Sequence, residues 1–323
     1  MSSRWARLTA IVVLVAAAIG TALALRGGRE FPVEFERSIS SSATGLARLQ
    51  LSEDGRLLFA AGGDGSVVHW LMPGTGSGEI LSPTGSVPVT VLGLTPDSLL
   101  LAGDLSGRLR LWELPSLKPL EIESPAVPVT CVAFREVAGR KQLFLGMAEG
   151  RIVTVDDQGA TPRVSGHRGV KALALNKEGT VLISGGSEGD LIWYDLQEQQ
   201  QQQIARQKTH SAEISVVLLS PGGDAVISAD WDGHVRVTST ATREVIATFS
   251  QPDAVSALAV HGEVIITGSW DRRVRVWEIK GDAGTLKSEF DTGAAVLGLA
   301  VTADGKTAMT VCGTRSVDFW KLP

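Results

Sequence analysis

Residues 268–278 read GSWDRRVRVWE, and this stretch decides the fold. Two small residues lead into a turn at Asp271, and an alternating run then ends on Trp277, a pattern typical of a tight turn between two short strands. Residues 229–239, ADWDGHVRVTS, have the same form 39 residues earlier, and residues 105–113, LSGRLRLWE, resemble both. One pattern that recurs at even spacing predicts a repeated β unit.

The repeat continues along almost the whole chain. Each unit combines an apolar strand, a turn, a second apolar strand that ends in small residues, an acidic-glycine turn, and a third strand with an aromatic position near its end. These third-strand positions, 39 to 44 residues apart, fall at Trp70, Trp112, Val155, Tyr194, Thr238, Trp277 and Trp320. A period near 40 that occurs seven times predicts an all-β fold, a seven-bladed β-propeller.

A short segment before the first complete unit is expected to close the ring. The seventh unit has three strands and no fourth after Trp320. Val33, Phe35 and Ile39 fall on one face of an extended chain, and Arg37 breaks the alternation. We expect residues 33–40 to pair outside residues 317–322, because an open strand edge would invite aggregation.

The chain resembles the WD-repeat family, most closely at residues 268–271, 274–278 and 109–113. The resemblance covers residues 33–323. A typical blade of that family links a His, a Ser or Thr, an Asp and a Trp in one hydrogen-bonded network. Carried over position by position, the resemblance implies a structural network of His167, Ser184, His210, Ser228, Asp232, Thr267, Asp271 and Trp277. No blade holds the full set. Glu188 and Tyr194 take the acidic and aromatic positions of the fourth unit, Thr238 replaces the Trp of the fifth, and the sixth has no His.

One group of residues is a candidate contact site for a partner. Trp231 and Trp270 occupy the same turn position in adjacent units, so both are expected on one face of the propeller. His234 follows the first tryptophan, and Arg272 and Arg273 follow the second. Aromatic and cationic side chains are enriched at protein interfaces. The alternative is that each tryptophan packs on the neighbouring blade.

Composition and motifs argue against catalysis and against nucleic-acid binding. The net charge is −5, and Lys and Arg are scattered among acidic residues, so no phosphate-neutralising surface is expected. The five histidines are not at metal-ligand spacing, and Cys131 and Cys312 lie far apart in the chain. No nucleophile or phosphate-loop motif occurs. We expect no catalytic residue, no cofactor and no metal, and therefore no enzyme.

The N-terminus suggests export or anchoring. Residues 1–7 form a short basic segment with Arg4 and Arg7, residues 8–25 are uncharged and apolar, and residues 26–32 form a linker. The apolar segment is just long enough for a transmembrane signal-anchor, and a cleaved signal peptide would have the same pattern. The charge balance favours a single-pass membrane protein with an extracytoplasmic propeller. The alternative is a secreted or periplasmic protein after signal cleavage.

Together these patterns predict a non-catalytic scaffold for protein–protein interaction, membrane-tethered or exported, that binds a protein partner of unknown identity through one face of the propeller. An alternative is an enzyme or small-ligand binder that uses the central channel. That use would need convergent polar residues, whereas the strands expected at the channel are mainly apolar, as at residues 216–219 and 294–300.

Overall fold

The computed structural model describes residues 33–322, except residues 75, 83–85, 96–98, 121, 123, 138, 157, 177 and 198–202. Every regular element in this part of the chain is a β-strand. The strands are β1 (Glu34–Ser40), β2 (Leu46–Leu51), β3 (Leu57–Gly62), β4 (Val67–Leu71), β5 (Glu79–Ser82), β6 (Val89–Leu94), β7 (Leu99–Asp104), β8 (Leu109–Glu113), β9 (Lys118–Leu120), β10 (Val129–Val137), β11 (Arg140–Met147), β12 (Arg151–Asp156), β13 (Gly159–Val164), β14 (Val170–Leu175), β15 (Val181–Gly186), β16 (Asp190–Asp195), β17 (Gln203–Lys208), β18 (Ile214–Leu219), β19 (Ala225–Asp230), β20 (His234–Ser239), β21 (Val245–Ser250), β22 (Val255–His261), β23 (Val264–Ser269), β24 (Arg273–Lys280), β25 (Ala283–Asp291), β26 (Gly298–Val301), β27 (Thr307–Val311) and β28 (Ser316–Lys321).

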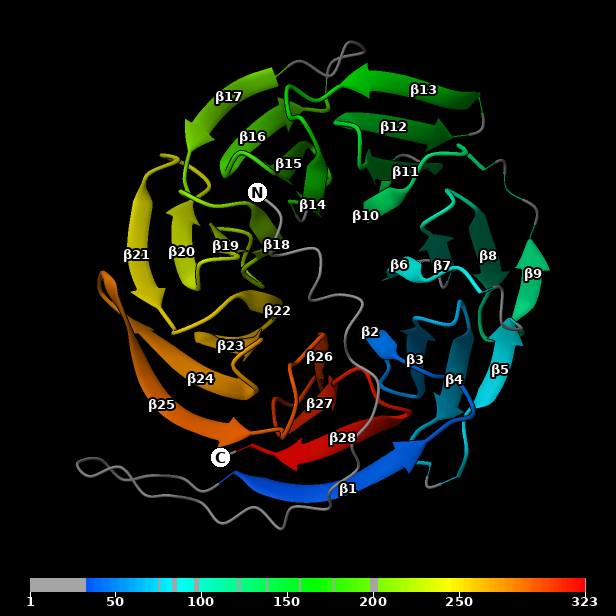
Figure 1. Cartoon of the computed structure of the whole chain (residues 1–323). Coiled ribbons are helices and arrows are strands. Elements are labelled where there is room, and N and C mark those ends of the chain that lie inside the picture. Colours follow the sequence, from blue (N-terminus) through cyan, green and yellow to red (C-terminus); the bar gives the residue numbers. More distant parts are fainter. Residues whose placement is uncertain are drawn as a thin grey trace, which may run out of the picture.

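The strands form antiparallel four-stranded meanders, here called blades and named by their strands. Five sheets are single blades, and the sixth joins the β18–β21 and β22–β25 blades. Figure 1 shows the blades arranged radially, with strands such as β2, β6 and β10 nearest the centre and β5, β13 and β17 at the rim. The all-β propeller-like fold predicted from the repeat is confirmed.

The pattern of burial explains why short apolar runs suffice for this fold. All six residues of β3 and all six of β19 are buried, because each second strand lies between two neighbouring blades. The rim strands β17 and β21 are largely exposed, and toward the end of each strand exposed residues alternate with less exposed ones. Strands that are buried on both faces have continuous apolar runs, whereas in half-exposed strands apolar and polar residues alternate.

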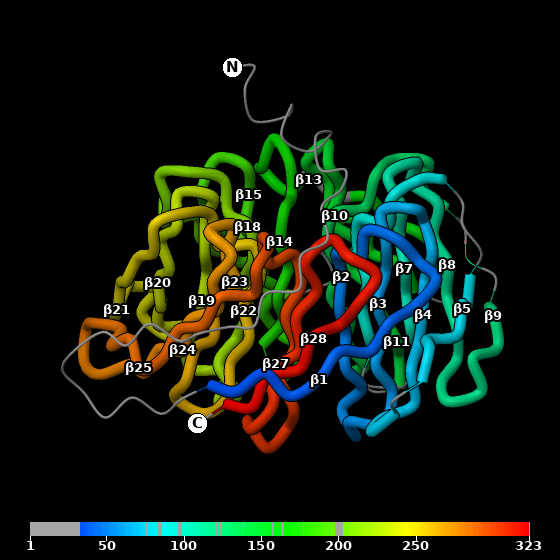
Figure 2. The backbone as a smooth tube through the Cα atoms, turned by 60° about the horizontal axis from the view of Figure 1, so that its bottom comes forward, coloured from blue at the N-terminus to red at the C-terminus, as the bar shows by residue number. Residues whose placement is uncertain are grey.

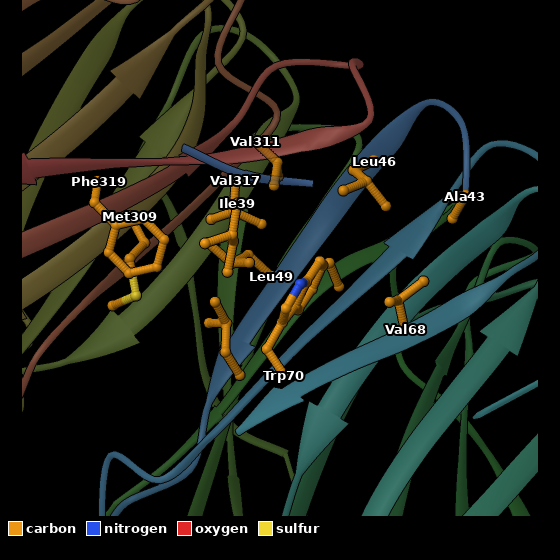
Figure 3. Packing of buried hydrophobic residues seen from close by; sticks show 12 residues of the cluster. Ile39, Ala43, Leu46, Leu49, Val68, Trp70, Met309, Val311, Val317 and Phe319 are labelled. Carbon is orange, nitrogen blue, oxygen red and sulfur yellow. The ribbon is translucent and has the colours of Figure 1, made fainter. Parts of the chain in front are cut away.

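The ring closes by pairing the first and last strands. β1 runs antiparallel to β28, with Ile39 opposite Val317 and Phe35 opposite Trp320, which confirms the expected pairing (Figure 2). Ile39 and Val317 are buried together with Phe319 in a cluster that reaches into the next blade (Figure 3).

A bulge in β1 corrects the expectation that Phe35 and Ile39 lie on the same face of the strand. The register shifts between Phe35 and Arg37, so Phe35 is 56% exposed while Ile39 is buried. Arg37 lies over the Phe319 ring, 4.6 Å from its centroid. The residue that breaks the sequence alternation is therefore the one that caps this aromatic ring.

The predicted apolar helix over residues 8–25 lies outside the described residues. Within residues 33–322 as described, no helix of the length and apolarity needed to cross a membrane is found.

Candidate interaction site

Two tryptophans from adjacent blades meet at the boundary between those blades. Trp231 follows β19 and Trp270 follows β23, and their rings stand edge to face, 5.1 Å apart and at 79°. Both side chains are half-buried. Each tryptophan thus packs against the neighbouring blade, as the alternative had it, and still keeps a solvent-facing part.

The turn that carries Trp231 is held by one carboxylate. The Oδ1 atom of Asp230 accepts hydrogen bonds from the backbone N–H groups of Asp232 and His234, each at 2.9 Å. Gly233 has a φ of +88°, and a Cβ at this position would lie 2.2 Å from the carbonyl oxygen of Gln251. Only glycine fits there without displacing the backbone.

The turn that carries Trp270 is built in the same way with different residues. Asp271 Oδ1 accepts the N–H of Arg273 at 3.0 Å, and Arg272 has a φ of +71°. The backbone N–H of Trp270 donates to the carbonyl of Ala254 at 3.1 Å, and the backbone N–H of Trp231 donates to that of Glu213, also at 3.1 Å. Both tryptophans therefore stand on fixed backbones.

The cations expected beside the pair differ in their availability. Arg272 is exposed. Arg273 forms an ion pair with Glu289 on β25 at 2.9 Å, so its charge is already compensated. His234 lies 3.4 Å from Asp230 and is partly exposed. Of these three side chains, Arg272 is the best placed to meet a partner.

Below Trp231 the blade is held by a buried network whose acid differs from the expected one. His210 Nδ1 donates to Asp230 at 3.0 Å, and His210 Nε2 lies 2.7 Å from Ser228 Oγ. The acidic member is thus Asp230 rather than Asp232. Sequence reasoning missed Asp230 because Asp232 matches the family position and stands only two residues away.

The charges in this network follow from burial. Desolvation lowers the pKa of His210 below its usual value, although Asp230 opposes the shift, so the imidazole is neutral. Burial alone would raise the pKa of Asp230, but the His210 hydrogen bond and the backbone N–H groups outweigh it and lower this pKa. Ser228, His210 and Asp230 are connected like a catalytic triad. All three are buried, with Ser228 and Asp230 at 0% exposure, so a substrate has no access.

The β14–β17 blade shows the expected variant of the network. His167 Nε2 lies 2.8 Å from Ser184 Oγ, and Glu188 approaches Nδ1 to 3.6 Å. Ser184 donates to the Tyr194 hydroxyl, which in turn donates to the Ser165 carbonyl at 2.5 Å. Burial lowers the pKa of His167 and raises the pKa of Tyr194 to about 12. These hydrogen bonds join β15 and β16 to the segment between β13 and β14.

In the β22–β25 blade a glutamine stands where the histidine is lacking. Trp277 Nε1 donates to Thr267 Oγ1 at 3.0 Å, and Thr267 donates to Gln251 Oε1 at 2.7 Å. Asp271 pairs with Arg275 at 2.7 Å instead of joining this chain of bonds. Gln251 precedes Thr267 by 16 residues, close to the His–Ser spacings in the two preceding blades, and this spacing is the signal that could have revealed it.

The described residues contain no group of three metal-ligating side chains. Both cysteines are free, and burial raises the pKa of Cys131 to about 12 and that of Cys312 to about 11. Thiols with such values are protonated near neutral pH and are therefore poor nucleophiles.

A family model described as "WD domain, G-beta repeat" matches residues 160–195, 201–239 and 243–278. These three segments are WD40 repeats. They cover the blades that carry the histidine networks, the Trp231 turn and the Trp270 turn.

Two solved structures share the fold, each with a TM-score of 0.78. One is a chain of the mitotic checkpoint complex, 19% identical, with 95% of this chain and 99% of that chain covered. The other is the β-propeller domain of Myceliophteria thermophila Cps50 (Swd1), 17% identical, with 90% and 100% covered.

Each curated relative matches this chain over only part of its length. They include the SAGA complex subunit Spt8 of Schizosaccharomyces pombe, 30% identical over 25% of this chain and 15% of the relative. Transcription factor unc-37 of Caenorhabditis elegans is 29% identical over 46% and 24%. The U3 small nucleolar RNA-associated protein 15 homolog of Gallus gallus is 25% identical over 64% and 40%. The matches thus span less than half the length of these relatives.

These relatives correct the expected localisation. The sequence favoured a single-pass membrane protein with an extracytoplasmic propeller, or a secreted or periplasmic one. The relatives are instead named as a complex subunit, a transcription factor and a protein associated with a small nucleolar RNA. Both predicted localisations are therefore wrong, and nothing supports the membrane as a partner through residues 8–25, which lie outside the described residues. An apolar pattern alone was too weak a basis for a localisation, because it does not by itself identify a membrane segment. Proteins with WD40 repeats, such as those matched here, are typically scaffolds that bind protein partners.

Proposed function

We propose that this chain is a non-catalytic scaffold that binds a protein partner through the face of the propeller that carries Trp231 and Trp270. The observation that carries the proposal is the edge-to-face pair itself, half-buried and flanked by the exposed Arg272. Tryptophan and arginine dominate the energetics of many protein interfaces. Because fixed turns hold both rings, little side-chain entropy would be lost on binding.

The rim of the propeller supports the same proposal. β21 and β25 pair in parallel at Thr248 and Ala283, which ties together the two blades that carry the tryptophans. Among the described strands, no other pair of blades is joined in one sheet. Phe249 packs against Trp277 at 4.6 Å, and Gly284 leaves the room that Phe249 needs. The joined blades would present Trp231 and Trp270 as one rigid surface.

The finer architecture is part of this proposal. The described strands are consistent with seven blades if the joined sheet counts as two and β1 completes the blade of β26–β28. Residues 33–323 would then form one propeller, and the His–Ser and Thr–Trp bonds would act as internal ties of its blades.

The test is quantitative affinity capture from a lysate of the source organism. We expect the wild-type chain to retain a specific protein and the double variant Trp231→Ala, Trp270→Ala to lose it, by tenfold or more, as two hot-spot residues imply. Leu286→Ala is the matched control, because Leu286 is an exposed apolar residue on the rim strand β25. Each variant must keep the wild-type circular dichroism spectrum. Equal capture by the wild type and the folded double variant would contradict the proposal.

A further inference from the structure

The centre of the propeller contains a cavity that the proposed interaction face does not use. The first strands of successive blades surround the central axis (Figure 1). Strands β2, β6, β10, β14 and β18 line a cavity of about 300 Å³. Polar and apolar groups contribute about equally to its lining, and the charged side chains among the described lining residues are Arg48 and Lys171.

A repeated bulge determines what the inner strands present to this cavity. The register of β6 and β10 shifts at Thr90 and Thr130, and β2, β14, β18 and β22 shift at the corresponding position. Thr90 Oγ1 donates to the carbonyl of Val129 at 2.7 Å, and Thr130 Oγ1 donates to that of Val170 at 2.5 Å. These hydroxyl protons are therefore already used to tie one blade to the next.

The two cations differ in their counter-charges. Lys171 Nζ lies 3.1 Å from Glu213 Oε1, so its charge is compensated. Arg48 has no such partner among the described residues. Its Nε donates to the Thr90 carbonyl at 2.8 Å and its Nη1 to the Ala47 carbonyl at 3.0 Å. A guanidinium has five N–H donors, so three remain available.

The surroundings leave this arginine open to an anion. Its side chain is exposed to solvent, and none of the described residues supplies a counter-charge. An oxyanion in the cavity would add charge-assisted hydrogen bonds to its free N–H groups. The two carbonyl contacts hold the guanidinium in place, so its free N–H groups are preorganised for a planar or tetrahedral oxyanion.

We propose that the central cavity binds a small molecule through a phosphate or carboxylate group held by Arg48. The site is independent of the tryptophan pair, so either proposal can fail without the other. Free Nη1 and Nη2 hydrogens donate to the oxyanion. Lys171, on β14 of the same cavity, adds a second positive charge whose field is reduced by Glu213.

Isothermal titration calorimetry tests the site with inorganic phosphate and with succinate as probes, at constant ionic strength set by chloride. We expect the full chain to bind at least one probe and Arg48→Gln to weaken that binding roughly tenfold to hundredfold, as the loss of charged hydrogen bonds implies. Arg48→Lys should fall between the two, because it keeps the charge and loses the fork of donors. Stronger binding of phosphate or of succinate identifies which oxyanion the cavity prefers.

The control variant is Arg56→Gln. Arg56 carries the same charge on a side chain that is 82% exposed and lies outside the cavity, so its removal should leave binding unchanged. If Arg48→Gln does not fold, the Arg48→Lys result decides. No binding of either probe by the wild type, or equal binding by the wild type and the Arg48 variants, would overturn the proposal.

Discussion

The buried side chain of Asp230 bonds both to the buried network and to the turn that carries Trp231. Its carboxylate holds His210, approaches His234 and accepts two backbone N–H groups of the turn beneath Trp231. Hydrogen bonds to a charged acceptor are stronger than neutral ones, and they are costly to lose in a buried site. Asp230 therefore links the interior of the blade to the geometry of the candidate surface.

The buried imidazole of His210 predicts a loss of stability in mild acid. Burial lowers the pKa of His210, so between that pKa and about 6.5 the unfolded chain binds one more proton than the folded chain. The contribution is complete above about pH 6.5 and is lost as the pH falls through this window. We expect the free energy of unfolding, measured by urea titration from pH 7 to pH 5, to fall with pH by up to about 1.4 kcal/mol per unit for this group.

A variant pair checks that assignment. His210→Gln should be less stable than the wild type at pH 7 and should show a shallower pH dependence. His261→Gln replaces an exposed histidine and should keep the wild-type slope. A wild-type slope in His210→Gln would show that other groups cause the acid sensitivity.

The sequence was sufficient for part of this network and insufficient for the rest. His210 and Ser228 were predictable because the resemblance to the WD-repeat family places its His and Ser at these positions. Whether Asp230 or Asp232 faces the imidazole depends on how the turn folds back, which spacing cannot tell. Arg48 had no signal at all, because its role depends on which strands surround the cavity.

At the scale of elements, β1 contributes to the ring through one buried side chain. Ile39 is 2% exposed and packs with Val317, Phe319 and Trp70 at the junction of the first and last strands. The placing of Val33, Phe35 and Ile39 on one face of an extended chain was enough to predict a strand here. The bulge that turns Phe35 outward was not predictable, because it depends on how Arg37 meets Phe319 across the pairing.

Ile39→Ala should therefore weaken the closure. We expect a loss of about 2 to 4 kcal/mol in the free energy of unfolding, the usual cost of removing a buried branched side chain, measured by urea titration. Glu34→Ala, on the exposed end of the same strand, should change it by less than about 0.5 kcal/mol. Similar effects of the two substitutions would mean that β1 is not needed to hold the ring together.

At the scale of the whole molecule, the repeat separates scaffold from surface. The buried second strands and the hydrogen-bonded ties maintain the blades, while the turns between second and third strands vary and carry Trp231 and Trp270. The repeat could be predicted because one spacing recurs along the chain. The contact of the two rings, and the joined rim beneath them, arise only when the blades are placed side by side.

The most direct test of the interaction surface is hydrogen–deuterium exchange of the chain, free and in complex with the captured partner. The proposal predicts that the partner slows exchange in the turns at residues 230–234 and 269–273 and leaves the rim strands β17, β21 and β25 unchanged. Protection confined to those rim strands, with none in the two turns, would contradict it.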